Sequence, residues 1–211
     1  MIISELKKKN YFRYIQLLFL DSKKAKSSIA IIFLLEYEMI KIFYSTEEPL
    51  LRKVKYQWLI EELEKRNSDF YLADSLIKCF KKLSIKKEII ELLNFFLKIE
   101  NDMKSPYNNL KFFKKVNTLC NEIFKKIIFK EGPFKISFFS QLIYFYYLSN
   151  EIKPSLNNEF EVIFKKINFN ELDCFEKTFI KIFMNQIKKQ KFLKISKLEF
   201  LFKSIFCIIY R

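Results

Sequence analysis

The chain has 211 residues, which is enough for one domain with a sizeable core or for two small ones. Its net charge is +15, half of its residues are hydrophobic and 18% are aromatic, so intrinsic disorder is excluded. One glycine, four prolines and no histidine exclude glycine-rich phosphate loops, doubly wound sheets, imidazole catalysis and histidine-ligated metals.

Apolar residues recur at helical spacing along the first part of the chain and predict a series of helices. The first two run over residues 11–20 and about 29–44, and the second carries one apolar stripe: Ile32, Leu35, Met39 and Ile42. Ser45 or Thr46 is a candidate N-cap for a third helix. That helix is expected to expose its glutamates and to pack through four apolar residues: Leu51, Val54, Trp58 and Leu63.

Further helices are predicted over residues 70–83, 85–100 and 110–129. The middle one is expected to turn four apolar side chains inward: Ile89, Leu92, Leu93 and Phe96. Gly132-Pro133 is the strongest break, and helical patterns follow at 136–148, 160–167, 171–188 and 198–210. Helices joined by short loops predict an all-α protein with one helical bundle over residues 1–211.

The lysine excess has two interpretations that the sequence leaves open. Lysine accompanies abundant Ile, Phe, Asn and Tyr, which share A/T-rich codons, so genomic base bias explains it without a function. The alternative is a basic face for anionic lipid or an acidic partner. Nucleic acid is not an expected partner, because no RNA- or DNA-binding motif accompanies the charge.

The cysteines are far apart and form no CxxC pair, so they are expected to be reduced core residues: Cys79, Cys120, Cys174 and Cys207. The N-terminal segment has no signal-peptide core, and the longest uncharged stretch, residues 136–150, is too short to span a bilayer. We expect a protein of the cytoplasm or an organelle matrix that is not secreted, has no transmembrane helix and touches a membrane peripherally.

Two stretches carry an ordered set of motifs. The first begins at Arg13-Tyr14, continues through Phe33 and Glu36, and ends with Glu48-Pro49 and Lys55-Tyr56-Gln57-Trp58. It resembles the opening of the squalene/phytoene synthase family, with its R-Y start, aromatic-x-x-E/D helix, E-P pair and R-x-Q-W segment. The F-x-x-E form looks most like the branch that contains a mitochondrial assembly factor for respiratory complex I and its bacterial relatives.

The second stretch, residues 92–122, places Asp102 and Pro106-Tyr107 where that branch has a D-L and P-Y pattern. The resemblance covers roughly residues 11–125, and the C-terminal part looks shortened or diverged. It implies an all-α bundle of the isoprenoid-synthase type.

Active members of the family condense two prenyl diphosphates and need Mg²⁺ held by aspartate-rich motifs on two facing helices. No two aspartates of this chain are three or four residues apart, and none lies between Asp102 and Asp173. Glu36 and Glu38 diverge by about 200° around a helix. Lys55 stands where the family has arginine and lacks the bidentate fork that suits a phosphate. The sequence predicts no catalytic residue and no metal, with Mg²⁺ expected only under the enzyme alternative.

Three of these residues have competing interpretations. Glu36 lies within an apolar helix and needs a partner, which Arg13 or Lys55 could supply as a structural ion pair rather than a ligand site. Trp58, the single tryptophan, either anchors helix packing or lines a cavity or partner-binding surface. Asp102 is expected to bond the loop backbone near Ser105.

The resemblance implies a non-catalytic assembly or accessory factor for respiratory complex I (NADH dehydrogenase) at the inner membrane surface. Its expected partners are NADH dehydrogenase subunits or assembly intermediates, and its basic charge suits peripheral contact with an anionic membrane. The alternatives are a Mg²⁺-dependent squalene/phytoene-type synthase of isoprenoid biosynthesis and a structural interaction module.

Overall fold

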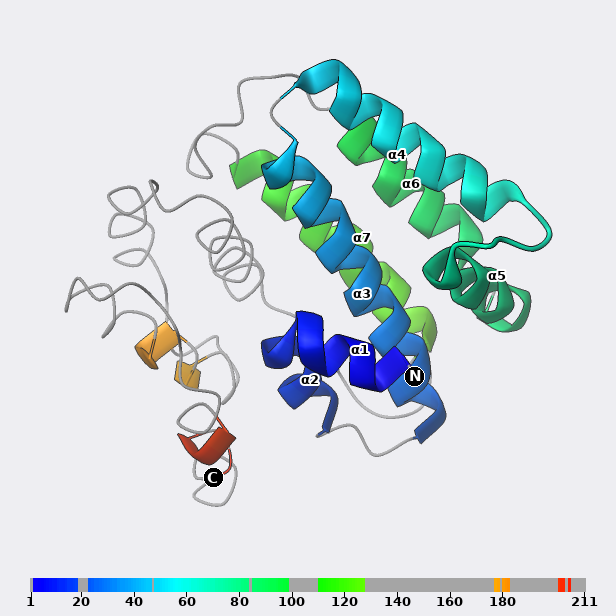
Figure 1. The fold of residues 1–211 in the computed structure, drawn as a ribbon. Helices are drawn as coiled ribbons and strands as arrows, with labels where there is room; N and C mark the ends of the chain where they lie inside the picture. Colours follow the sequence, from blue (N-terminus) through cyan, green and yellow to red (C-terminus); the bar gives the residue numbers. More distant parts are fainter. Residues whose placement is uncertain are drawn as a thin grey trace. The chain divides into compact units, whose positions relative to one another are not determined.

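The computed structural model describes residues 2–18, 23–46, 48–83, 85–98 and 110–127, with short pieces at 177–178, 180–182, 201–203 and 205. Every regular element in these ranges is a helix, so the predicted all-α class is confirmed (Figure 1). The chain divides into two compact units, Met1–Lys104 with Lys114–Lys135 and Ser105–Phe113 with Ile136–Arg211. All contacts discussed below lie in the first unit, and the single-domain organisation stays a prediction.

Two short helices begin the chain, α1 (Ile2–Lys9) and α2 (Tyr11–Leu18), and both pack against α3. Asn10 separates them: its backbone N–H donates to the Leu6 carbonyl, and its side-chain oxygen accepts from the Arg13 backbone N–H at 3.1 Å. This is an N-cap geometry: the Asn10 side chain accepts a hydrogen bond from a backbone N–H that has no partner within α2. Helix α2 was predicted from the sequence, whereas α1 was not.

The 23-residue helix α3 (Lys23–Ser45) is central to this unit, because α1, α2, α4 and α5 all contact it (Figure 1). Three of the predicted stripe residues, Ile32, Leu35 and Met39, are buried, whereas Ile42 is partly exposed. Burial extends over the continuous run from Ile29 to Leu35. A helix that is apolar on every side belongs in an interior, which is where α3 lies.

Helix α4 (Pro49–Glu64) begins at a proline, which suits the first helical position because that N–H has no intrahelical partner. The expectation that Ser45 or Thr46 caps this helix is wrong. The N-cap is Glu48, which makes no side-chain cap hydrogen bond. Thr46 instead closes α3, donating its backbone N–H to the Ile42 carbonyl at 3.2 Å.

The remaining helices are α5 (Tyr71–Leu83), α6 (Lys86–Leu97) and α7 (Leu110–Ile127). The four residues predicted to face inward from α6 are all buried: Ile89, Leu92, Leu93 and Phe96. The described part of α7 adds an edge-to-face contact between Phe124 and Phe33 of α3, with ring centroids 5.4 Å apart. Cys79 and Cys120 are buried free thiols, as predicted, while Cys174 and Cys207 lie outside the described residues.

The C-terminal end of α4 carries a buried carboxylate, and this predicts acid sensitivity. Two hydrogen bonds lower the pKa of Glu62 below its ordinary value of 4.5. The larger effect comes from Lys65 and the smaller one from Ser68. A carboxyl group whose pKa is lower in the folded chain stabilises the fold above the unfolded pKa, and this stabilisation is lost as the pH falls through the folded-state pKa. We expect Glu62→Gln to flatten the loss of stability below pH 4.5.

The measurement is urea unfolding over a pH series. Lys65→Met, which removes the donor and keeps the carboxylate, should bring the folded-state pKa of Glu62 closer to its unfolded value and so make this loss of stability smaller. If both variants lose stability over the same pH range as the unmodified chain, other carboxylates control its acid sensitivity.

Candidate functional site

The motif residues Arg13 and Glu36 form a buried ion pair between α2 and α3. Arg13 Nε donates to Glu36 Oε2 and Nη2 donates to Oε1, both at 3.0 Å, so the pair is bidentate. Arg13 is fully buried and the Glu36 side chain is 3% exposed. Of the two predicted partners for Glu36, the structure has Arg13.

Arg13 makes further contacts within α2 and with α3. Nη1 donates to Gln16 Oε1 at 2.8 Å, one turn along α2. The guanidinium carbon lies 4.9 Å from the centroid of the Phe33 ring, a distance typical of a cation–π contact. Since both oxygens of Glu36 accept from the same guanidinium, this carboxylate is engaged in a structural pair.

Glu38 points to a different neighbour, as its two-residue spacing from Glu36 predicts. Its Oε1 accepts from Lys9 Nζ of α1 at 2.8 Å, and the same ammonium contacts Glu5 Oε1 at 3.2 Å and the Tyr71 hydroxyl at 3.3 Å. Burial lowers the pKa of Lys9, but the hydrogen bond and charge of Glu38, with smaller effects of Tyr71 and Glu5, raise it above its ordinary value overall. Glu36 and Glu38 therefore each form an ion pair with a different basic side chain.

Lys55 lies at the junction of α3 and α4 and not beside Glu36. Its Nζ donates to Thr46 Oγ1 at 2.9 Å. Nearby, Nε and Nη2 of Arg52 donate to the Thr46 carbonyl at 3.3 and 3.2 Å. The two basic side chains thus bind the end of α3, where unpaired carbonyls favour cations.

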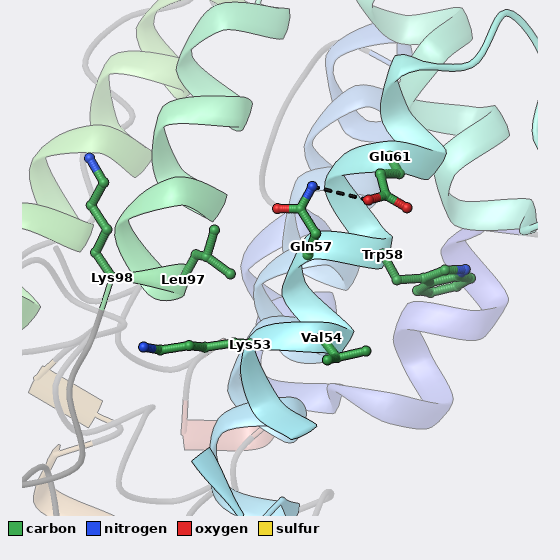
Figure 2. A pocket seen from close by; sticks show the side chains of 7 residues that line it. All are labelled: Lys53, Val54, Gln57, Trp58, Glu61, Leu97 and Lys98. Atoms are coloured by element: carbon green, nitrogen blue, oxygen red, sulfur yellow. Dashed lines mark hydrogen bonds between the residues drawn. The ribbon is translucent and has the colours of Figure 1, made fainter. Parts of the chain in front are cut away.

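An open pocket lies beside α4, where its exposed side meets the end of α6 (Figure 2). Its volume is about 730 Å³, and its lining combines apolar groups, two lysines and one hydrogen-bonded polar pair: Lys53, Val54, Gln57, Trp58, Glu61, Leu97 and Lys98. Figure 2 shows Lys53 extending toward the end of α6, whereas Val54 and Trp58 project to the other side. Gln57 Nε2 donates to Glu61 Oε1 at 3.1 Å.

The packing expected for α4 is wrong for three of its four apolar residues. Leu51, Val54 and Trp58 are exposed, and only Leu63 is buried. The helix packs instead through four other residues on the opposite side: Tyr56, Leu59, Ile60 and Glu62. Because Glu62 is buried on the packed side, the prediction that it is exposed is also wrong.

The two neighbouring aromatics Tyr56 and Trp58 thus have opposite environments. Tyr56 is fully buried, donates its hydroxyl hydrogen to the Met39 carbonyl at 2.7 Å and packs on Phe96 with centroids 5.6 Å apart. The Trp58 side chain meets Phe70 at a centroid distance of 5.2 Å and keeps 45% of its surface exposed. Of the interpretations left open for Trp58, the one that places it at a pocket or binding surface agrees with this exposure.

Of the other predicted positions, the structure describes Tyr14, Glu48 and Pro49. Tyr14 is partly exposed and stacks near Tyr11, with centroids 5.8 Å apart, and Glu48 and Pro49 begin α4. Asp102 and Tyr107 lie outside the described residues. Across the described ranges, no three acidic or sulfur-containing side chains lie together as a metal-binding group.

These observations define an all-α protein in which Arg13 and Glu36 form a buried ion pair, while Gln57 and Trp58 line an open pocket. No family model matches the chain, and no curated protein or solved structure is significantly similar to it. Among the helices that the structure describes, none has the length and apolar character that a membrane span requires.

Proposed function

We propose that this protein is a non-catalytic assembly or accessory factor for respiratory complex I, acting at the inner membrane surface. The proposal rests on the resemblance carried by the ordered motifs from Arg13 to Trp58. It takes as its partners NADH dehydrogenase subunits or assembly intermediates.

The observation that supports a non-catalytic role is the Arg13–Glu36 pair. The resemblance makes Glu36 the carboxylate of the aromatic-x-x-E motif, which a synthase would need for Mg²⁺. In this chain both Glu36 oxygens are 3.0 Å from Arg13 nitrogens in a buried site. A metal ion there would have to displace a guanidinium and leave it buried without its counter-charge, which is strongly unfavourable.

The experiment is affinity purification of the tagged full chain from native membranes, at low and at high salt, with mass spectrometry of the bound proteins. We expect salt-resistant recovery of NADH dehydrogenase subunits, because a specific interface with an apolar centre survives screening. The matched control is the same preparation with a tag alone. Recovery of unrelated proteins only would overturn the proposal and favour a structural interaction module.

A second assay addresses the enzyme alternative. The purified chain is incubated with prenyl diphosphates and Mg²⁺, and the products are separated by chromatography. We expect unreacted substrate. Formation of a head-to-head condensation product would refute the non-catalytic role, and Glu36→Gln would then show whether this carboxylate takes part.

A further inference from the structure

Helix α4 has a second apolar face, opposite the one that packs into the core. Its members are exposed to 67%, 44%, 56% and 45%: Leu50, Leu51, Val54 and Trp58. At 3.6 residues per turn these four residues lie within an arc of about 100°, the width of an apolar stripe that normally faces a core. Large exposed apolar surfaces of this kind mark interaction sites.

The charges around this face have one predominant sign. Lys53 is exposed on the side of α4 that is turned toward the end of α6, and Lys98 is exposed across the pocket (Figure 2). Lys55 donates to the neutral Thr46 hydroxyl, so this bond leaves its positive charge uncancelled. Among the described residues, the first half of α4 and the end of α6 therefore place three lysines near this face against Glu48, and the exposed acidic residues of α4, Glu61 and Glu64, follow toward its C-terminal end.

We propose that this face, made of Leu50, Leu51, Val54 and Trp58 and flanked by Lys53 and Lys98, docks on the surface of an anionic phospholipid bilayer. The inference deepens the proposed function and rests on it for the membrane involved. Leucine and tryptophan enter the interfacial region, while lysines beside them meet lipid phosphates. The net charge of +15 attracts the whole chain to the same surface.

The charges also decide between a bilayer and a second copy of this chain. Each copy of the chain carries a net charge of +15, and a net charge this far from zero opposes self-association. An anionic bilayer supplies both the apolar layer and the counter-charges that this face requires.

Trp58 is the only tryptophan of the chain and lies within the face, so its fluorescence reports the proposed contact directly. The full chain is titrated with vesicles of phosphatidylcholine mixed with phosphatidylglycerol, and separately with phosphatidylcholine alone. We expect a blue shift of the emission and weaker acrylamide quenching with the anionic vesicles, because the indole leaves water for the interface.

Two matched pairs of variants keep Trp58 as the reporter. Leu50→Ser with Leu51→Ser should weaken vesicle binding by at least about tenfold, since two half-exposed leucines lose their burial. Ile3→Ser with Leu18→Ser, which changes exposed apolar residues of α1 and α2, should leave it unchanged. Lys53→Glu should weaken binding by about fivefold or more, while Lys81→Glu on α5 is the control for net charge.

Several outcomes would overturn the proposal. They are an unchanged Trp58 emission with anionic vesicles, equal binding by the leucine variant, or a blue shift that grows with protein concentration without lipid, which indicates self-association. A shift produced by an acidic amphipathic peptide but not by vesicles would assign the face to a protein partner. If Trp58 responds to vesicles and the affinity purification recovers no NADH dehydrogenase subunit, the docking surface stands and the proposed function does not.

Discussion

Replacing Arg13 by methionine is expected to lower the free energy of unfolding by about 3–5 kcal/mol. The substitution leaves the Glu36 carboxylate buried with neither of its two guanidinium hydrogen bonds, and it also removes the donor to Gln16 Oε1. The side chain of methionine retains much of the packing of the arginine stem. The measurement is urea denaturation followed by far-ultraviolet circular dichroism at neutral pH.

The double variant Arg13→Met with Glu36→Leu separates the charge effect from the packing effect. Because an apolar pair of similar size often replaces a buried ion pair at little cost, the double variant should recover most of the lost stability. Lys78→Met is the matched surface control: Lys78 pairs with Asp74 at 2.6 Å but is 71% exposed, so its loss should change stability by about 0.5 kcal/mol or less. A single-variant loss as small as this control would contradict the buried pair.

Tyr56→Ala is expected to destabilise the protein by about 3–5 kcal/mol, whereas Trp58→Ala should cost less than about 1 kcal/mol. The reason is burial: the Tyr56 ring is fully enclosed against Phe96, and the larger Trp58 ring is partly in solvent. Circular dichroism during urea unfolding measures both variants without relying on tryptophan emission.

Tyr56→Phe measures how much the Tyr56 hydroxyl contributes to the free energy of unfolding. It keeps the ring and leaves the Met39 carbonyl without this donor, so we expect an intermediate loss of about 1–2 kcal/mol. If Trp58→Ala proves more destabilising than Tyr56→Ala, then the buried side of α4 has been assigned incorrectly and the proposed docking face is withdrawn with it.

Helical periodicity predicted helices α2 to α7 but not which side of α4 faces inward. Leu51, Val54 and Trp58 form a regular stripe, and so do Tyr56, Leu59 and Leu63 on the other side. A pattern with two apolar faces has no unique solution from periodicity alone, since both faces gain from burial. Packing against α6, through Tyr56 and Phe96, decides between them.

The sequence predicted that a basic side chain pairs with Glu36, but not which residue supplies it. A carboxylate within an apolar helix requires a partner, which left Arg13 and Lys55 as candidates. The choice depends on the position of α2 relative to α3, and no local pattern encodes that position. Helix α1 was missed for a related reason: it has eight residues and three consecutive lysines, and its burial of Leu6 is a tertiary contact.

The contacts of Lys9 have a consequence for the order in which the chain folds during synthesis. Its partners Glu38 and Tyr71 follow it by 29 and 62 residues, so α1 gains its full set of neighbours only after α5 has left the ribosome. Helices α2 and α3 contact α1 before that point, so Tyr71 adds a late polar partner to a helix that already packs on its neighbours.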